Sequence, residues 1–323
     1  MKSLFTTVLL FAFASAFSQN KPPTVEEIRQ GIAGEIASFK VAATPVAKIE
    51  NIKVWTGTDS LKVRLYYPDA KKKRHSIIYQ IHGGALVGGD LNTHDNVCRL
   101  LAARTSSIVV AVDYRKPPES PYPAGVDDCI SILNWITRTA ASWSGDLTQL
   151  TLLGDSGGGL LATALLVKEQ GRIPIKKVVL INPAVDLRNA GEGLYGLVSQ
   201  LYLNGKSAND SLTSPILATN LSFAPPTLIV TSEKDILKSQ GVAWYGKLQK
   251  AGVMVSMIDI PGEDHLGGLW SAGHPKAKQA IDETIKFING EKGHNRTANT
   301  GFMQHRLKNE CSTKAVLFAV AKA

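Results

Sequence analysis

Short apolar runs that alternate with helical patterns are the feature that most limits how this chain can fold. The runs are rich in β-branched residues, which suits strands buried on both faces of a parallel sheet. They lie at Ile77–Ile81, Ile108–Val112, Leu150–Leu153, Val178–Ile181, Thr227–Thr231 and Met254–Ile260. Helical patterns occur at Asp95–Arg104, Ala124–Arg138, Gly158–Gln170, Leu237–Ala251 and Pro275–Ile288. This alternation predicts an α/β layered fold.

The residues before these runs predict one helix and two further strands. Thr24 followed three residues later by Glu27 is a capping-box pattern, which marks the start of a helix. Apolar residues then recur at helical spacing as far as Phe39. Strand character follows near Ile49–Trp55 and Leu61–Tyr67. We therefore expect a mostly parallel central sheet flanked by helices, in a domain that spans residues 19–290.

One long segment interrupts the alternation. Between Ile181 and Pro226 about 45 residues contain no clear strand, and only Tyr195–Tyr202 has a helical pattern. Long insertions in compact domains usually have a function. We interpret this segment as a cap over the sheet.

The first eighteen residues have the pattern of a secretory signal. Lys2 supplies a positive start, Leu4–Phe13 is largely apolar, and small residues follow. Ala14-Ser15-Ala16 fits a cleavage site, and so does Ala16-Phe17-Ser18, which would leave Gln19 as the first residue. The apolar run is shorter than the roughly 20 residues that span a bilayer. We therefore expect residues 1–18 to be a cleaved signal peptide. The protein would then be exported, periplasmic or secreted, with no stable membrane span after cleavage.

The net charge of +9 does not predict nucleic-acid binding. Six basic and two acidic residues fall in the polar tail, residues 291–323, which carries +4 and which we expect to be disordered. Lys2 belongs to the signal, and the +4 that remains is ordinary for a domain of this size. No stripe of basic and aromatic residues accompanies it.

Three cysteines, Cys98, Cys129 and Cys311, are too few for a disulfide framework. Cys98 and Cys129 lie in apolar helical patterns, which favour buried thiols. A bridge between these two stays open, because sequence gives no distance.

Gly154-Asp155-Ser156-Gly157-Gly158 matches the G-x-S-x-G pattern of a serine nucleophile. The pattern is weak alone, but here it follows the strand Leu150–Leu153 and opens a helix, as the motif requires. The sharp turn is expected to strain Ser156, to need glycine at both outer positions and to be fixed by hydrogen bonds of Asp155. A phosphate-binding loop is disfavoured, because neither G-x-x-x-x-G-K-[ST] nor G-x-G-x-x-G in register is present.

A serine hydroxyl needs a base within hydrogen-bond reach, and the base needs an orienting carboxylate. Four histidines follow the serine. His294 and His305 lie in the tail, and His274 adjoins the final helix as a surface or capping residue. His265, in the loop after the last strand, is the expected base.

The carboxylate should lie between the serine and the histidine in the chain. Asp235 follows the strand Thr227–Thr231, Glu233 lies two residues nearer the strand end, and Asp264 adjoins His265. Side chains of neighbouring residues rarely face each other well enough to pair. We therefore expect Asp235, with the other two as rivals.

Backbone donors for the oxygen of a tetrahedral intermediate are expected from Gly83, Gly84 and Gly157. The first two belong to His82-Gly83-Gly84-Ala85 after the strand Ile77–Ile81, where an oxyanion loop belongs, and Gly157 follows the nucleophile. His82 is expected to order this loop rather than to act as a base. Neither H-E-x-x-H nor C-x-x-C occurs, so we expect no metal site.

Four stretches within about residues 76–290 form a characteristic set. They are His82-Gly83-Gly84-Ala85; Val112-Asp113-Tyr114-Arg115 with Pro118-Glu119 and Tyr122-Pro123-Ala124; Gly154-Asp155-Ser156-Gly157-Gly158-Gly159; and Ser214-Pro215 through Pro225-Pro226-Thr227 to Asp235 and His265. Taken together, and in this order, they resemble the hormone-sensitive-lipase-like group of α/β-hydrolases.

This resemblance implies an α/β-hydrolase fold with a small helical cap, built from about residues 19–45 and 186–222. It also implies a serine carboxylesterase that hydrolyses small or short-acyl esters without a cofactor. By position, Ser156, Asp235 and His265 would be the triad. Gly83, Gly84 and Gly157 would be the oxyanion donors.

Three residues depart from the family pattern. Ala85 replaces the third glycine of H-G-G-G, Leu86 stands where an aromatic residue is frequent, and Gly157 stands where alanine is usual. We expect Ala85 to leave the backbone donors intact and to narrow the pocket, Leu86 to change the shape of the acyl pocket, and Gly157 to be harmless.

Two other functions stay open. One is a peptidase on the same fold, which an assay on an aminoacyl amide would distinguish. The other is a non-catalytic binder of small molecules. Relatives of that kind lose the histidine, whereas His265 is present here. The natural ester and the oligomeric state are not predicted.

Overall fold

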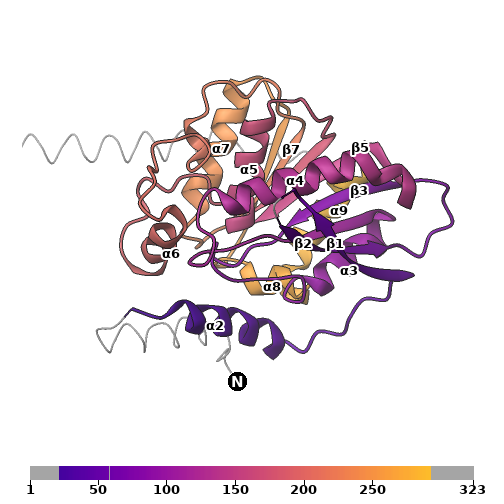
Figure 1. Ribbon diagram of the computed structural model, residues 1–323, viewed down its shortest axis with the longest axis horizontal. Coiled ribbons are helices and arrows are strands. Elements are labelled where there is room, and N and C mark those ends of the chain that lie inside the picture. The colour runs from indigo at the N-terminus through magenta and orange to yellow at the C-terminus, as the bar shows by residue number, and fades with distance from the viewer. Residues whose placement is uncertain (1–21, 58, 292–323) are drawn as a thin grey trace, which may run out of the picture.

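An eight-stranded sheet forms the centre of the protein, whose computed structural model describes residues 22–57 and 59–291 (Figure 1). Antiparallel pairing joins β1 to β2 and β2 to β4, and every other pair in the sheet is parallel. The strands in spatial order are β1 (Lys48–Trp55), β2 (Ser60–Tyr67), β4 (Ile108–Asp113), β3 (His75–Ile81), β5 (Gly145–Asp155), β6 (Lys177–Ile181), β7 (Thr227–Ser232) and β8 (Val255–Ile260). The mostly parallel sheet predicted from the apolar runs is confirmed.

Helices cover both faces of this sheet (Figure 1). One face carries α4 (Ala124–Thr139), α5 (Gly157–Glu169) and α7 (Lys238–Lys250). The other carries α3 (Asp95–Thr105), α8 (Gly267–Ser271) and α9 (Lys278–Asn289). Short 3₁₀ turns lie at Ala140–Trp143, Pro215–Leu217 and Pro275–Ala277.

Each predicted helix is present within a few residues of its expected bounds, with one difference at the last of them. The pattern Pro275–Ile288 begins with a 3₁₀ turn and becomes α-helical only at Lys278. The five-residue helix α8 had not been predicted.

Alternate side chains of each buried strand enter separate cores on the two faces. In β3, Ile77 and Tyr79 pack on the side of α4 and α5, whereas Ile78 packs on the side of α3 and α9. Cys129 of α4 and Cys98 of α3 belong to different cores, and both are buried free thiols. The bridge that the sequence left open is absent, because the sheet lies between the two residues.

A third and smaller apolar cluster joins α2 (Val25–Ser38) to α6 (Gly193–Leu203). Ile28 and Val198 meet there at Val87, in the loop after β3. The predicted capping box begins α2: the Glu27 N–H donates to the Thr24 hydroxyl, and the Thr24 N–H donates to the Glu27 carboxylate.

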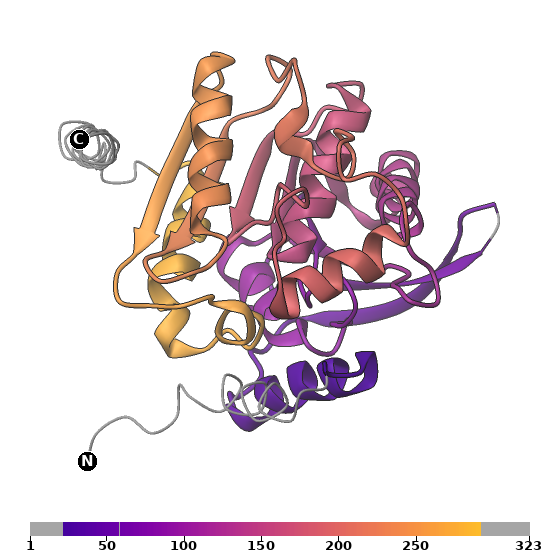
Figure 2. The same cartoon turned by 90° about the vertical axis from the view of Figure 1, so that its left-hand side faces the viewer.

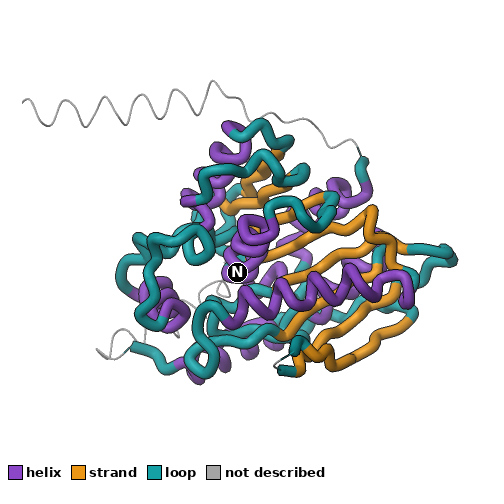
Figure 3. The backbone as a smooth tube through the Cα atoms, turned by 45° about the horizontal axis from the view of Figure 1, so that its top comes forward, coloured by secondary structure: helices purple, strands orange, loops and turns teal. Residues whose placement is uncertain are grey.

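These two helices lie beyond the carboxyl ends of the parallel strands. Figure 2 shows α2 below the arrowheads of the sheet. The segment between β6 and β7 is mostly loop around α6 (Figure 3). The exact limits of the cap, 19–45 and 186–222, stay a prediction.

No helix in the described part of the chain has the length and apolarity needed to cross a bilayer. The predicted signal peptide, residues 1–18, lies outside the described residues. So does the predicted tail, apart from Glu291.

Candidate active site

Four loops that carry predicted site residues meet at the carboxyl edge of the sheet. β3 leads into His82, β5 into Ser156, β7 into Asp235 and β8 into His265. Parallel strands bring their carboxyl ends to one edge, and this is where open α/β sheets bind ligands.

Ser156 lies in a strained turn between β5 and α5. Its φ of 52° and ψ of −120° fall outside the regions that L-residues favour. Its N–H donates to the Ile181 carbonyl at 2.9 Å. A β-carbon at Gly154 would lie 2.5 Å from the Gly158 carbonyl oxygen, and one at Gly158 would lie 2.2 Å from that of Ile81. Both outer positions of the motif therefore need glycine, as predicted.

His265 bridges the serine and a carboxylate. Its Nε2 lies 2.9 Å from Ser156 Oγ, and its Nδ1 lies 3.1 Å from Asp235 Oδ1. With the proton on Nδ1, the ring donates to Asp235 and accepts from the Ser156 hydroxyl. Burial acts to lower the pKa of His265, but the hydrogen bond and charge of Asp235, together with the charges of Asp155 and Glu35, outweigh it, so the pKa lies above its usual value. The imidazole is placed to accept the serine proton.

Asp235 is buried and receives three hydrogen bonds. Besides His265, Asn182 Nδ2 donates to its Oδ2 at 2.7 Å and the Leu237 N–H donates to its Oδ1 at 3.0 Å. Burial acts to raise the pKa of Asp235, but His265 and the two other donors hold it below its usual value. The group is therefore a carboxylate at neutral pH.

The two rival carboxylates make no hydrogen bond to the imidazole. Glu233 accepts from the Gly262 N–H at 2.7 Å, and Asp264 is exposed. The loops thus bring only the first of the three predicted candidates, Asp235, against His265.

The other downstream histidines do not enter this cluster within the described chain. His274 caps a 3₁₀ turn by accepting from the Lys276 N–H at 3.1 Å, as predicted. His294 and His305 lie outside the described residues.

Asn182 is a site residue that the sequence interpretation missed. Its amide donates to Ser232 Oγ at 3.1 Å as well as to Asp235. A signal was present: Asn182 directly follows β6, and a polar residue at the carboxyl end of a buried parallel strand points at the site edge.

Asp155 holds together the loops around Ser156, as predicted. Its carboxylate accepts from Gln80 Nε2 at 3.0 Å, from the Gly83 N–H at 3.1 Å and from His94 Nε2 at 3.1 Å. His94 Nε2 also lies 2.8 Å from Ser271 Oγ in α8. One buried carboxylate thereby connects β3, the following loop and α8.

One of the three predicted oxyanion donors is already engaged. The hydrogen bond from the Gly83 N–H to Asp155 argues against Gly83 as a donor to substrate. The N–H groups of Gly84 and Gly157 have no acceptor in the part of the chain that the structure describes. The same holds for Ala85, which adopts a φ of 54°. The motif locates the loop but does not say which amides turn away from Asp155.

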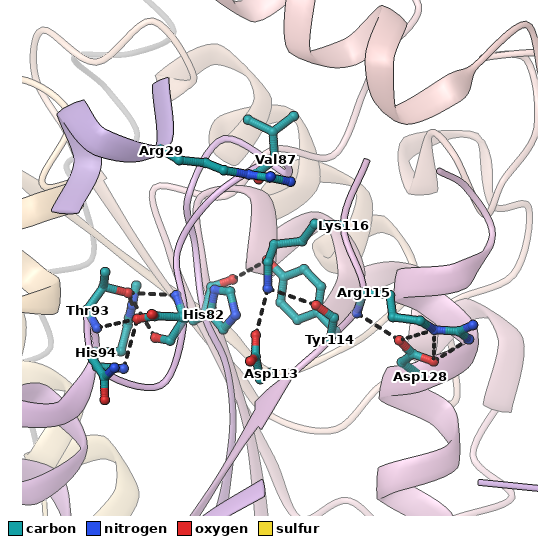
Figure 4. A network of polar contacts seen from close by, with 12 residues as sticks. Arg29, His82, Val87, Thr93, His94, Asp113, Tyr114, Arg115, Lys116 and Asp128 are labelled. Atoms are coloured by element: carbon teal, nitrogen blue, oxygen red, sulfur yellow. Dashed lines mark hydrogen bonds and ion pairs between the residues drawn. The ribbon is translucent and has the colours of Figure 1, made fainter. Parts of the chain in front are cut away.

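His82 orders this loop, as predicted. Its Nδ1 lies 2.7 Å from the Gly83 carbonyl oxygen, and its ring stacks on Tyr114 with 4.3 Å between centroids (Figure 4). The Tyr114 hydroxyl donates to the His82 carbonyl at 2.8 Å. Burial holds the pKa of His82 well below its usual value, so the ring is neutral.

Two of the departures from the family pattern contact each other. A β-carbon at Gly157 would lie 3.1 Å from Leu86 Cδ2. Leu86 is buried and has a φ of 63°. Its side chain takes part of the space that an alanine methyl at position 157 would need. The two substitutions therefore compensate each other beside the serine.

Arg29 ties α2 to the loop after β3 (Figure 4). Its Nε donates to the Val87 carbonyl at 2.8 Å, and its guanidinium also donates to the Pro117 carbonyl at 3.0 Å. The same group forms a two-pronged ion pair with Glu119, at 2.8 and 2.7 Å. The cap-side helix is thus anchored beside Gly84 and Ala85.

Two surface cavities lie away from this cluster. One of about 550 Å³ is lined by His75 and Ser144, at the amino ends of β3 and β5, and one of about 380 Å³ is lined by Arg29 and Glu119. Neither is lined by Ser156. Within the described residues, no group of three or more His, Cys, Asp or Glu side chains could hold a metal ion.

Known proteins share this arrangement of sequence and fold. A family model described as alpha/beta hydrolase fold matches residues 78–267. Carboxylesterase NlhH of Mycobacterium tuberculosis is 31% identical over 237 residues, which cover 67% of this chain and 74% of that protein. Ethyl acetate hydrolase of Pseudomonas putida is 32% identical over 225 residues, which cover 64% and 71%. The solved structure of a hyperthermophilic esterase from Pyrobaculum calidifontis matches with a TM-score of 0.77 and 27% identity, over 84% of this chain and 95% of that one.

Proposed function

Because the chain belongs to the α/β-hydrolase family, in its hormone-sensitive-lipase-like carboxylesterase branch, and is a carboxylic ester hydrolase, we propose that Ser156, His265 and Asp235 form its catalytic triad. The observation that carries this proposal is the position of His265. Its two ring nitrogens lie within hydrogen-bond distance of the serine and the aspartate.

The proposed reaction is acyl transfer to water in two steps. His265 accepts the Ser156 proton while Oγ attacks the ester carbonyl carbon. The resulting imidazolium, stabilised by Asp235, protonates the alcohol oxygen as the ester bond breaks. In the second step His265 accepts a proton from water, which attacks the acyl-enzyme, and returns that proton to Oγ as the acid leaves.

The oxygen that becomes negative in each step needs backbone donors. Gly84 and Gly157 keep their predicted role in this proposal, because their N–H groups have no acceptor in the described chain. Ala85 replaces Gly83 as the third donor, since the Gly83 N–H is held by Asp155. Each such donor typically contributes about 100- to 1,000-fold to the rate.

We expect esters of small or short acyl groups to be the best substrates. The name of the Pseudomonas putida relative, an ethyl acetate hydrolase, supports this class. Turnover of nitrophenyl esters from acetate to palmitate should therefore decline steeply with acyl length, and a preference for palmitate would contradict this substrate class.

The triad is tested by Ser156→Ala with Ser271→Ala as its matched control. Ser271 also contacts a histidine that lies near an aspartate, but in the buried network of Asp155. We expect Ser156→Ala to lower kcat by roughly four to six orders of magnitude with the fold unchanged. Ser271→Ala should stay within about tenfold of the native enzyme. Ester turnover that survives in folded Ser156→Ala would refute the assignment.

We propose export for this protein on the pattern of residues 1–18. The positive start, the short apolar run and the small residues that follow support a cleaved signal. Intact mass of the protein from the periplasm or the medium should correspond to a chain that starts at Phe17 or Gln19. Recovery of the full-length chain from the cytoplasm alone would contradict the proposal.

A further inference from the structure

Glu35 brings a carboxylate close to His265 from the cap-side helix α2. A β-carbon at Gly268 would lie 2.8 Å from Glu35 Cδ and 2.9 Å from its Oε2. A β-carbon at the preceding Gly267 would lie 3.2 Å from His265 Cδ2. The carboxylate and the imidazole therefore pack against consecutive residues at the start of α8.

The Glu35 carboxylate has no hydrogen-bond or ion-pair partner in the described part of the chain, although it is half-buried. Burial raises the pKa of Glu35, and the charge of His265 acts in the opposite direction. A desolvated carboxylate is stabilised by a nearby cation. The cation that forms beside it is the imidazolium of the proposed reaction.

Three carboxylates act on His265 from three different elements. Asp235, after β7, has the strongest effect because it also makes the hydrogen bond. Asp155, the last residue of β5, and Glu35, on α2, act through charge alone. Asp155 is fixed by its own three donors. Glu35 alone lies on an element outside the sheet and its connecting loops.

We propose that Glu35 is a positioning residue that stabilises the imidazolium of His265 through its charge, and so couples the seating of α2 to the strength of the base. This inference rests on the proposed triad. With α2 seated, Glu35 favours transfer of the serine proton to His265. When α2 moves away, His265 keeps Asp235 and Asp155 but loses this third charge.

The central test is Glu35→Gln, which removes the charge and keeps the shape. In the pH profile of kcat/KM, the fall in activity at acid pH (the acid limb) should move to lower pH by about half a unit. The reason is that the imidazolium loses a nearby negative charge that stabilised it. On the alkaline plateau kcat should fall about threefold, with KM nearly unchanged. Glu35→Asp keeps the charge on a shorter side chain, so its acid limb should lie close to that of the native enzyme. A packing role would give the opposite ranking of these two variants.

Two further variants sharpen the test. Gly268→Ala puts a methyl where the Glu35 carboxylate now lies, so the flexible end of that side chain must swing away. It should shift the acid limb in the same direction as Glu35→Gln, and the double variant should show no further shift. Glu26→Gln removes an exposed carboxylate from the same helix and should leave the limb where it is.

A titration of the His265 ring by NMR, with its resonance identified from a His265→Asn variant, reads the same shift without turnover. An unchanged His265 titration in Glu35→Gln would overturn this inference and leave the triad standing. Survival of turnover in Ser156→Ala would instead overturn the proposed function. The two failures are therefore distinguishable.

Discussion

Two buried carboxylates at one edge of the sheet have different tasks because their donors differ. Asp155 receives Gln80, Gly83 and His94, and these bonds hold loops in place. Asp235 accepts a hydrogen bond from His265, whose other ring nitrogen lies against the Ser156 hydroxyl. At this scale the chemistry depends on which donors each oxygen meets.

Asn182→Ala tests the support of Asp235. The change removes one donor from a buried carboxylate, which typically costs about 1.5–3 kcal/mol of stability for a hydrogen bond to a charged group. We expect a lower melting temperature and a kcat reduced about tenfold, since the aspartate is freer to turn from His265. Ser232→Ala removes the other partner of the Asn182 amide and leaves the bond to Asp235. Equal kcat in Asn182→Ala and the native enzyme would show that His265 and the Leu237 N–H orient the aspartate without Asn182.

The pH dependence of turnover follows from His265. Its imidazole must be neutral to accept the serine proton, and Asp235 raises its pKa above the ordinary value of about 6.5. Activity should therefore be lost as the pH falls, with a kcat/KM midpoint above 6.5. Asp235→Asn removes the charge and the hydrogen-bond acceptor, so any residual activity should have its acid limb at lower pH. A midpoint well below 6.5 in the native enzyme would contradict this account.

Residue types in sequence predicted the triad candidates but not their partners. Ser156 and His265 carry strong signals, because a G-x-S-x-G turn after a strand and a histidine after the last strand have few other uses. The roles of Gly83 and Asn182 depend on how side chains point. Gly83 is not free to donate to substrate because its N–H donates to Asp155, and Asn182 supports the site because its amide donates to Asp235. Consecutive glycines look alike in sequence, so the motif could not say which amide was engaged.

At the scale of elements, predictability followed length and periodicity. The capping box of α2 and the buried strands had clear signals. All of them except β5 lie within a few residues of their predicted bounds, and β5 begins at Gly145, five residues before the predicted start at Leu150. Helix α8 is five residues long and begins with two glycines, so it shows no apolar period. Its place is set by contacts, since Trp270 is buried in the core beside α3 and α9.

The hydrogen bonds of Arg29 to backbone carbonyls hold helix α2 in place more than its ion pair with Glu119 does. Arg29→Met removes the bonds to the Val87 and Pro117 carbonyls together with the Glu119 pair. Glu119→Gln removes only the pair, and Glu119 is mostly exposed, so its loss costs less than about 1 kcal/mol. We expect Arg29→Met to lower kcat/KM about tenfold by loosening the oxyanion loop, and Glu119→Gln to stay within about twofold. Equal effects in steady-state kinetics would assign the tie to the ion pair.

At the scale of the whole molecule, the residues that stabilise the fold and the residues proposed for catalysis lie at different places on the sheet. Two apolar cores on its faces hold the strands, and neither core includes Ser156, Asp235 or His265. The polar groups collect at the carboxyl edge, under α2 and α6. A ligand that bonds to Ser156 therefore adds contacts at the edge without disturbing either core.

A short alkylboronic acid, which adds reversibly to an activated serine, should consequently stabilise the folded protein. At a concentration of 100 times its Kd the free energy of unfolding rises by about 2.7 kcal/mol. For a domain of this size that corresponds to an increase in Tm of about 5 °C by calorimetry. Ser156→Ala should lose the increase because the boron has no oxygen to bind, whereas Ser271→Ala should keep it. An equal increase in both variants would place the boronate elsewhere on the protein and contradict an activated serine at the sheet edge.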